Sequence, residues 1–256
     1  MGSLDGKKAL IFGVASHHSI AWAIAQKLHA AGAELAFTYQ ERFEKNIRKL
    51  LADQPDAPLM LCDVQDDAQI DAVFNTIGER WGGLDLLVHA VAFASRDALS
   101  GRYIDTTRSD FQQSLDISAY SLVAMTRRAE PLMMARGGGS VVAMTYQASQ
   151  RVVPNYNLMA VAKAALETTV RYLAYDMGAN GIRVNAISAG PIRTISAMGV
   201  GAVRNIFDTV EEKAPLHRNI SADDVGDLAL FLASDGAKNI TGQVLFVDAG
   251  HGTLAG

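Results

Sequence analysis

The chain of 256 residues is 49% hydrophobic and 20% charged, a composition typical of one globular α/β domain. Its net charge of −4, with no evident concentration of Lys and Arg, disfavours nucleic acid as a partner. A single cysteine, Cys62, excludes a disulfide and a cysteine-rich metal site, and no run reaches the roughly 18 apolar residues that span a bilayer, so we expect a cytoplasmic protein with neither metal nor membrane association.

Short apolar runs alternate with segments of helical period along the whole chain. The predicted strands are 7–12, 34–39, 58–61, 84–90, 139–145, 182–187 and 243–247. The predicted helices are 19–31, 43–51, 68–81, 111–134, 155–177 and 222–234. This alternation predicts a single α/β domain over 1–256, with a doubly wound parallel sheet of about seven strands and helices on both faces. Ligands of such sheets bind beyond the carboxyl ends of the strands.

The first predicted strand runs into a glycine-led loop and then an apolar helix. Gly13 suits a tight turn, and Ser19 is a good N-cap for a helix whose free amides and positive dipole end can receive a pyrophosphate. The usual G-x-G-x-x-G fingerprint is absent, and an ordinary strand–helix connection has the same features. We expect His17 and His18 to face solvent. The candidate cofactor contacts in this loop are Gly13, Ala15, Ser19 and Ile20.

Polar residues follow the second and third strands, where the adenosine of a dinucleotide would lie. Gln40 and Glu41 disfavour the 2′-phosphate of NADP, whereas Arg42 attracts it, and on balance we predict NAD. After the third strand, Asp63 and Val64 are placed to bond and pack an adenine. An equally good interpretation is that Asp63 caps the following helix.

The loops after the fourth and sixth strands complete the predicted cofactor site. Pro191 forces a turn, after which Ile192 and Thr194 offer an amide and a hydroxyl to a carboxamide or a diphosphate. The segment near 190–214 is predicted to be a mobile loop that binds substrate as a lid. After the fourth strand, small side chains would let a ligand approach the backbone, although a packed strand end would look the same; they are Ala90, Val91 and Ala92.

A tyrosine and a lysine lie seven positions apart on the predicted helix 155–177, at Tyr156 and Lys163. Seven steps of about 100° return to within about 20° of the start, so both side chains emerge on one face, about 10.5 Å apart along the axis. A phenol that stabilises or protonates an oxyanion, beside an ammonium that holds a cofactor hydroxyl, suits nicotinamide-dependent reduction. Taken separately, each is also an ordinary residue for a helix surface.

These motifs together resemble one known family. The residues that carry the resemblance are Gly13-x5-Ser19-Ile-Ala, Gln40, Tyr146, Pro154-Asn-Tyr156-Asn-x-Met-x-x-Ala-Lys163 and Arg183-Val-Asn-Ala-Ile-Ser-Ala-Gly-Pro-Ile-Arg-Thr194. The chain is similar, nearly end to end, to the bacterial enoyl-[acyl-carrier-protein] reductases, a divergent branch of the short-chain dehydrogenases/reductases. The resemblance implies a Rossmann-type fold, NADH as cofactor, an enoyl thioester on acyl carrier protein or coenzyme A as substrate, and a homotetramer.

The resemblance also implies roles for individual residues. Tyr156 and Lys163 match the family's catalytic pair, Tyr146 lies in its substrate pocket, and Lys163 holds the nicotinamide ribose. A hydride passes to the β-carbon of the enoyl thioester while Tyr156 stabilises the thioester oxygen, and the charge of Lys163 is expected to lower the pKa of that tyrosine.

Carbonyl-reducing relatives carry Tyr-x3-Lys and a serine about thirteen residues before that tyrosine. Here Met159 occupies their tyrosine position and Tyr146 their serine position, so the carbonyl-reducing pair is missing. Two alternatives to an enoyl reductase stay open: a carbonyl (3-oxoacyl) reductase of the same superfamily, and a non-catalytic NAD-binding protein. The second would be expected to lose Tyr156 or Lys163, and both are present.

Three alanines depart from the family pattern. The residues after the fourth-strand histidine are usually Ser-Ile-Gly-Phe, whereas this chain has Ala90 and Ala92 at the serine and glycine positions. Ala160 replaces a glycine inside the Tyr-x6-Lys motif. We hypothesise that Ala92 narrows the space in which diphenyl-ether inhibitors of this family, such as triclosan, stack on the nicotinamide.

Overall fold

Seven parallel strands form one sheet in the computed structural model, in the order β3-β2-β1-β4-β5-β6-β7. The structure describes residues 3–54, 56–194 and 203–254, without the side chains of 203–205. Each strand lies within two residues of its predicted ends, which confirms the predicted fold. The strands are β1 (Lys8–Phe12), β2 (Glu34–Tyr39), β3 (Leu59–Leu61), β4 (Leu86–His89), β5 (Gly139–Thr145), β6 (Ile182–Ala189) and β7 (Val244–Val247).

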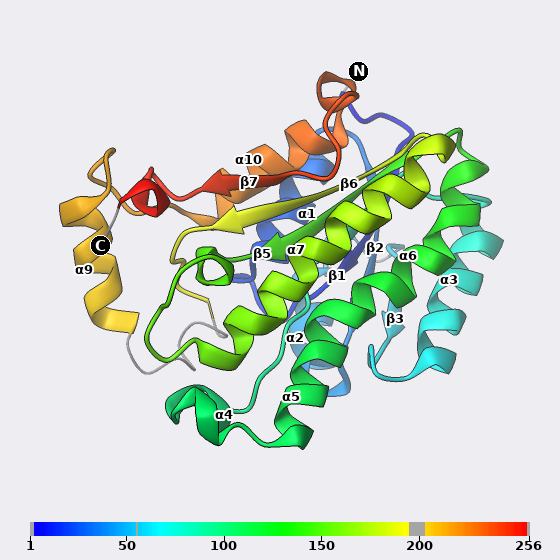
Figure 1. Cartoon of the computed structure of the whole chain (residues 1–256). Coiled ribbons are helices and arrows are strands. Elements are labelled where there is room, and N and C mark those ends of the chain that lie inside the picture. The colour runs from blue at the N-terminus through cyan, green and yellow to red at the C-terminus, as the bar shows by residue number, and fades with distance from the viewer. Residues whose placement is uncertain (1–2, 55, 195–202, 255–256) are drawn as a thin grey trace.

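Helices cover both faces of the sheet (Figure 1). The α-helices are α1 (Ile20–Ala30), α2 (Glu44–Leu50), α3 (Asp67–Trp81), α4 (Arg96–Ser100), α5 (Arg108–Leu115), α6 (Ser121–Met134), α7 (Asn157–Met177), α9 (Val203–Lys213) and α10 (Ala222–Ala233). Short 3-10 turns are η1 (Glu41–Phe43), η2 (Tyr103–Asp105), η4 (Gln147–Ser149), η5 (Gly178–Asn180), η6 (Asp235–Ala237) and η7 (His251–Thr253). One face carries α3, α6 and α7, and the other carries α1, α2 and α10.

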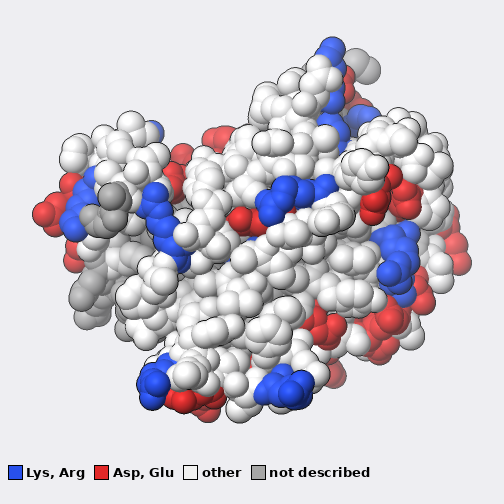
Figure 2. Space-filling view, in the orientation of Figure 1, with Lys and Arg blue, Asp and Glu red and all other residues white. Residues whose placement is uncertain are grey.

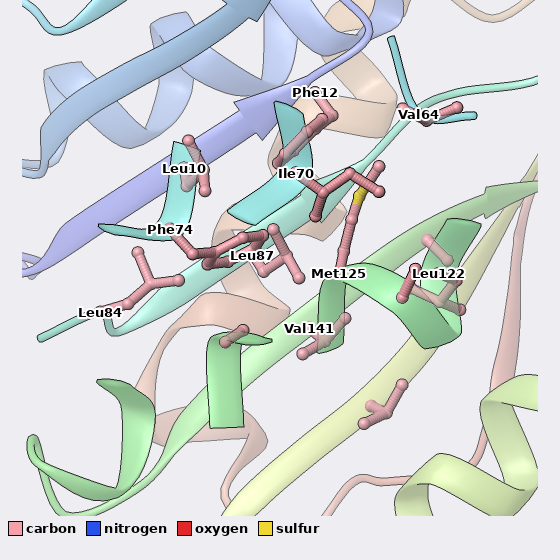
Figure 3. Close-up of a cluster of buried hydrophobic side chains, with 14 of the residues drawn as sticks. Leu10, Phe12, Val64, Ile70, Phe74, Leu84, Leu87, Leu122, Met125 and Val141 are labelled. Atoms are coloured by element: carbon pink, nitrogen blue, oxygen red, sulfur yellow. The ribbon is translucent and has the colours of Figure 1, made fainter. Parts of the chain in front are cut away.

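Alternation along the strands builds a separate core on each face. In β1, Leu10 and Phe12 pack against α3 and α6, whereas Ala9 and Ile11 pack against α1 and α10. Figure 3 shows the first of these cores, in which strand side chains meet those of the covering helices. Because both faces are covered, the strands are mostly apolar, and the buried Asn185 within β6 is compensated by donating to the Ile240 carbonyl at 2.8 Å and accepting from the Gln243 amide at 3.1 Å.

The amino ends of the strands are held together by one buried carboxylate. Asp85 is 3% exposed. It accepts hydrogen bonds from Lys7 Nζ and the Lys8 amide, each at 3.0 Å, and from Arg136 Nε at 3.1 Å. These contacts join the start of β1, the start of β4 and the segment after α6, so the charge of Asp85 is compensated within the protein.

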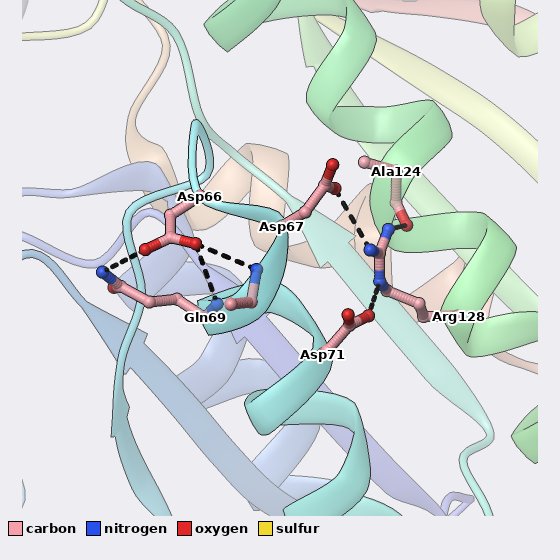
Figure 4. Close-up of polar contacts among 7 residues, drawn as sticks. Asp66, Asp67, Gln69, Asp71, Ala124 and Arg128 are labelled. Atoms are coloured by element: carbon pink, nitrogen blue, oxygen red, sulfur yellow. Dashed lines mark hydrogen bonds and ion pairs between the residues drawn. The ribbon is translucent and has the colours of Figure 1, made fainter.

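A second polar cluster joins α3 to α6 on the outer surface (Figure 4). Arg128 on α6 bonds Asp67 Oδ1 at 3.1 Å and also pairs with Asp71, both on α3. At the start of α3, the carboxylate of Asp66 accepts from the amides of Ala68 and Gln69 and thereby caps the helix. Asp67 and Asp71 are more than half exposed, so this cluster contributes modestly to stability.

The helix predicted at 155–177 begins two residues later than expected, at Asn157. Asn155 follows Pro154 and has φ of 61°, the left-handed region, so it cannot belong to a right-handed helix. Tyr156 therefore lies at the N-cap, outside the helix, although its carbonyl accepts the first intrahelical bond from the Ala160 amide at 2.8 Å. The prediction that Tyr156 and Lys163 are both within one helix was wrong by this one residue.

The prediction of one continuous helix over 111–134 was also wrong. The segment starts earlier, as α5, and is interrupted by a π-helical turn, η3 (Asp116–Tyr120), before it continues as α6. The wider turn buries Ser118, whose hydroxyl accepts from the Phe93 amide at 3.0 Å. Such turns insert a residue without ending the helix, a change that hydrophobic periodicity does not reveal.

The second half of the segment predicted as a loop near 190–214 is helical, as α9. Residues 195–202, the middle of the predicted lid, lie outside the described residues. No helix of the described chain is long and apolar enough to cross a membrane. On the face shown in Figure 2, acidic and basic side chains form small, separate groups.

Candidate active site

The order of the strands reverses between β1 and β4, and Gly13 lies directly after β1 at this point. Its φ of +102° is one that side-chain-bearing residues rarely adopt. A Cβ atom on Gly13 would also lie 2.2 Å from the carbonyl oxygen of Ala90, which follows β4. The two loops therefore touch through their backbones, and only glycine fits there, as the prediction of a tight turn requires.

The loop between β1 and α1 is organised by Ser19. Its hydroxyl accepts hydrogen bonds from the amides of Ala15 and Ser16, each at 3.0 Å. Ser19 has the extended backbone of an N-cap, but its side chain does not cap α1, so the expected capping bond is absent. The first turn of α1, which begins at Ile20, contains no acidic residue, so its positive dipole end is not neutralised from within. The N-terminal end of α1 is therefore a suitable binding site for a diphosphate.

At the end of β2, Arg42 is already engaged by the protein. Its guanidinium donates to Gln40 Oε1 at 2.8 Å and lies 4.7 Å from the centre of the Phe43 ring. Gln40, which disfavours a 2′-phosphate, and Arg42, which attracts one, therefore contact each other. His17 and His18 are exposed, as predicted, and their rings lie 3.8 Å apart.

The structure separates the two interpretations of Asp63. The cap of α3 is Asp66, whereas Asp63 is exposed and accepts from the Gln65 amide at 3.1 Å within its own loop. Val64 is buried beside it, and Cys62 is buried too, with the pKa of its thiol raised to about 12 chiefly by that burial. Asp63 is thus free of the capping role and stands exposed beyond the carboxyl end of β3.

Tyr146 and Tyr156 are brought together beyond the carboxyl end of β5. Their ring centres lie 4.9 Å apart at an interplanar angle of 64°, an edge-to-face contact. Burial raises the pKa of both phenols, and Tyr146 raises that of Tyr156 further. The expectation that Lys163 lowers the pKa of Tyr156 was wrong for the protein alone, because desolvation is the largest influence on that phenol. Both tyrosines are therefore protonated hydrogen-bond donors at neutral pH.

Lys163 is buried, with 5% exposure, and its ammonium donates to the carbonyl oxygen of Met144 at 2.7 Å. Burial lowers its pKa to about 8, while the negative charge of Glu167 acts in the opposite direction. At neutral pH the ammonium is mainly charged, so it is available to hold an oxygen ligand. Its bond to a β5 carbonyl places it at the same strand end as Tyr146.

Two buried ionisable side chains near Lys163 escaped the sequence analysis. Glu167 lies one turn further along α7, and His89 is the last residue of β4. His89 Nε2 lies 2.7 Å from Ser121 Oγ, and burial followed by the charge of Lys163 lowers the pKa of the imidazole to about 3. A glutamate four residues after a lysine is usually an exposed helix pair, so its spacing gave no signal.

The loops after β4 and β6 flank this centre. Val91 is half-buried and Ala92 is exposed, so small groups do line the end of β4 as predicted. Ile192 is buried, and the Thr194 amide bonds its carbonyl at 2.9 Å. A cavity of about 360 Å³ lies between the β1–α1 loop, the residues after β6 and the start of α10. Among the described residues, no three His, Cys, Asp or Glu side chains are grouped to hold a metal ion.

The predicted site residues thus fall into two neighbouring groups at one edge of the sheet. The tyrosine pair and Lys163 follow β5 and begin α7, and the glycine loop, Ala90 and Ile192 surround the reversal in strand order. Gln40 and Asp63 follow β2 and β3, further along the same edge. An extended ligand along this edge would meet both groups.

Comparison with known proteins agrees with this arrangement. The family model described as enoyl-(acyl carrier protein) reductase matches residues 13–252. The chain is 50% identical over 255 residues, 98% of each chain, to the Nostoc sp. protein named enoyl-[acyl-carrier-protein] reductase [NADH] FabI. It is 48% identical over 257 residues to the Bacillus cereus protein of the same name, covering 99% of this chain and 100% of that one.

Solved structures are equally similar. The crystal structure of the Bacillus cereus enoyl-acyl carrier protein reductase with NADP+ and indole naphthyridinone superposes with a TM-score of 0.96, at 48% identity and full coverage of both chains. The Anaplasma phagocytophilum reductase in complex with NAD gives a TM-score of 0.94 at 44% identity, covering 100% of this chain and 97% of that one. The chain therefore belongs to the enoyl-[acyl-carrier-protein] reductase family of the short-chain dehydrogenases/reductases.

Proposed function

We propose that this protein catalyses the NADH-dependent reduction of trans-2-enoyl thioesters, carried by acyl carrier protein, to saturated acyl thioesters. The observation that carries the proposal is the edge-to-face pair of protonated phenols, Tyr146 and Tyr156, at the strand end that also anchors the Lys163 ammonium. This set offers hydrogen-bond donors and a cation where a reduction would develop negative charge.

The cofactor site in this proposal follows the carboxyl edge of the sheet. Gly13 and Ala90 leave a backbone surface without side chains, and the unneutralised start of α1 suits the diphosphate. We assign the remaining contacts to Ala15, Ser19, Ile20, Gln40, Asp63, Val64, Val91, Ala92, Lys163, Ile192 and Thr194. The bond between Arg42 and Gln40 keeps that guanidinium occupied, which favours NADH over NADPH.

NADH, when bound, would supply a hydride to the β-carbon of the enoyl group, and the resulting enolate would take up a proton, relayed through the Tyr156 phenol, to give the saturated thioester. The contribution of the protein is positioning and electrostatic stabilisation. Because its pKa is raised, Tyr156 meets the thioester oxygen as a protonated donor and stabilises the negative charge that collects there. Lys163, charged at neutral pH, holds ribose hydroxyls and favours the developing anion. Tyr146 packs on Tyr156 and limits its orientations.

Carbonyl reduction is disfavoured by the place of Met159. This residue stands where carbonyl reductases have their tyrosine, and it is buried, with 6% exposure. Tyr156, three residues earlier, is at the N-cap of α7 and half-buried. The position of this tyrosine, three residues before the one used by carbonyl reductases, distinguishes this site from theirs.

We extend the proposal to a homotetramer. Large aromatic side chains are exposed on α7, where Tyr172 is 69% and Tyr175 85% exposed, and on the opposite face of the sheet at Phe231 of α10. Two apolar surfaces on one subunit suit two different two-fold contacts. A cytoplasmic location is part of the same proposal, because a free, buried Cys62 suits a reducing compartment.

The activity is tested by following NADH oxidation with paired enoyl and 3-oxoacyl thioesters, each on acyl carrier protein and on coenzyme A. We expect consumption with the enoyl substrate, little with the 3-oxo substrate, and a higher kcat/KM with NADH than with NADPH. Consumption with the 3-oxo thioester alone would contradict the proposal. NADH binding without turnover of any thioester would leave the non-catalytic alternative. Analytical ultracentrifugation tests the tetramer.

A further inference from the structure

Glu167 is a buried carboxylate on α7, one helical turn beyond Lys163 and 5% exposed. A buried carboxylate is costly unless hydrogen bonds compensate for the water it has lost. Its Oε1 atom accepts from Thr145 Oγ1 at 2.7 Å and from Ser149 Oγ at 2.6 Å. No ion pair among the described residues includes it. The contacts of this carboxylate are therefore two short hydrogen bonds to hydroxyls.

Those two hydroxyls stand on either side of Tyr146. Thr145 is the last residue of β5, and Ser149 is the last residue of η4. The turn between them is closed by the Ser149 amide, which donates to the Tyr146 carbonyl at 3.1 Å. The carboxylate of Glu167 thus binds both ends of the turn that carries Tyr146, and Tyr146 in turn packs against Tyr156.

Lys163 and Glu167 hold consecutive residues at the end of β5. Lys163 Nζ donates to the carbonyl of Met144, and Glu167 accepts from the next residue, Thr145. Because the two side chains emerge four residues apart on one helix, they lie on the same face of α7. The pair therefore sets the position of α7, with its N-terminal Tyr156, relative to the end of β5.

We propose that Glu167 is a positioning residue of this active site: its carboxylate holds the 145–149 turn against α7 so that Tyr146 and Tyr156 meet substrate in one fixed geometry beside Lys163. It acts through the two hydroxyls and does not touch substrate. The inference rests on the proposed roles of Tyr146, Tyr156 and Lys163.

Four enzymes test the proposal in steady-state assays with an enoyl thioester. Glu167→Leu removes the acceptor, the double variant Thr145→Val/Ser149→Ala removes both donors, and Glu167→Gln keeps an acceptor oxygen. Ser140→Ala is the matched control, because Ser140 is also a buried β5 hydroxyl, bonded at 2.9 Å to the Leu232 carbonyl far from the site.

We expect Glu167→Leu and the double variant each to lower kcat by about tenfold to a hundredfold, the range expected when reacting groups are misplaced by about 1 Å. The KM for NADH should stay near its wild-type value in the double variant, which keeps the negative charge of Glu167 beside Lys163. Glu167→Gln should restore most of kcat. Ser140→Ala should lower the thermal midpoint without lowering kcat. Should Glu167→Leu not fold, the single variant Ser149→Ala, at a partly exposed position, decides the same point through kcat.

Wild-type kcat in the double variant, or a loss in Glu167→Gln as large as that in Glu167→Leu, would overturn the positioning role. Tyr156→Phe is assayed alongside to separate this proposal from the one it rests on. If Tyr156→Phe loses turnover while the Glu167 series does not, only the role of Glu167 fails. If Tyr156→Phe keeps full turnover, the proposed catalytic roles fail first.

Discussion

The two edges of the sheet treat buried charge in opposite ways. At the amino edge, Asp85 receives three hydrogen bonds, two of them from cationic side chains, all within the protein itself. At the carboxyl edge, Lys163 is equally buried but donates to a backbone carbonyl, and burial lowers its pKa to about 8. The charge of Asp85 is compensated without a ligand, whereas Lys163 is a charge whose environment a ligand would improve.

This difference separates stability from activity in space. Substitutions at the amino edge should change the free energy of unfolding and leave turnover per folded molecule unchanged. Substitutions at the carboxyl edge should do the reverse, because a site held ready for a ligand is stabilised less by its own contacts.

The largest effect is expected at the tyrosine pair. Tyr156→Phe removes the donor that stabilises the thioester oxygen but keeps the ring that packs on Tyr146. We expect kcat to fall by about a hundredfold or more, as for the loss of a general acid, with unchanged NADH affinity and thermal midpoint. Tyr172→Phe, at an exposed position of α7, is the control. Full activity in Tyr156→Phe would remove that phenol from the mechanism.

The next effect concerns the buried lysine. Lys163→Met should weaken NADH binding by about tenfold, the value of a hydrogen bond from a charged donor, and fluorescence titration measures it. In the wild type, NADH affinity should fall as pH rises above about 8, where the folded lysine loses its proton. The same affinity in Lys163→Met should be nearly independent of pH through this range.

The stability of the wild-type protein should depend on pH in the opposite direction to its NADH affinity. The unfolded lysine keeps its proton up to its ordinary pKa of 10.5, whereas the folded one releases it near 8. Between these values the unfolded state binds more protons, so the free energy of unfolding should rise with pH. Urea unfolding at two alkaline pH values measures this rise, which should be smaller in Lys163→Met. An identical rise in both proteins would mean that another group titrates.

At the amino edge, Asp85→Asn should lower the free energy of unfolding by about 2–3 kcal/mol, because a buried charged acceptor is lost to three donors. Turnover per folded molecule should not change. Asp71→Asn is the control: it loses an ion pair with Arg128 at an exposed carboxylate and should lower the free energy of unfolding much less. Urea unfolding and kcat measured on the same samples decide, and a loss of kcat in Asp85→Asn would show that the edges are coupled.

Much of this organisation was predictable from sequence because it depends on local patterns. Apolar periodicity gave the strands, and a glycine directly after β1 predicted the turn at Gly13. The spacing of Tyr156 and Lys163 predicted a shared site, and both residues lie beyond the carboxyl end of β5, although Tyr156 lies just outside the helix. The two residues are about two helical turns apart, so an error of one residue at the helix start leaves Tyr156 at the end of α7 nearest Lys163.

The features that were missed depend on contacts between distant segments. Glu167 looks like a surface residue until β5 and η4 place two hydroxyls against it. The wide turn η3 (Asp116–Tyr120) is visible only where Ser118 meets the backbone after β4. The raised pKa of Tyr156 follows from burial, which no spacing of Tyr and Lys reveals. Sequence patterns located the site, whereas its electrostatics required the packed structure.

The smallest effect is expected at Ala92, which we propose lies against the cofactor at the carboxyl edge. Ala92 is exposed and has no left-handed φ, so Ala92→Gly relieves no strain and should cost at most about 1 kcal/mol of stability.

The same substitution should change inhibition by triclosan. Removing one methyl group from the cofactor edge gives the inhibitor more room, and we expect inhibition to strengthen about fourfold, the change in affinity that corresponds to the free energy of burying one methylene group. Inhibition assays at matched NADH concentrations measure this change, with Ala160→Gly as the comparison inside the Tyr-x6-Lys motif. Equal inhibition of wild type and Ala92→Gly would place the inhibitor away from this methyl group. A fourfold change with unaltered kcat would show that small side chains at the carboxyl edge select ligands without contributing to the fold, which is the contrast with Asp85 in its simplest form.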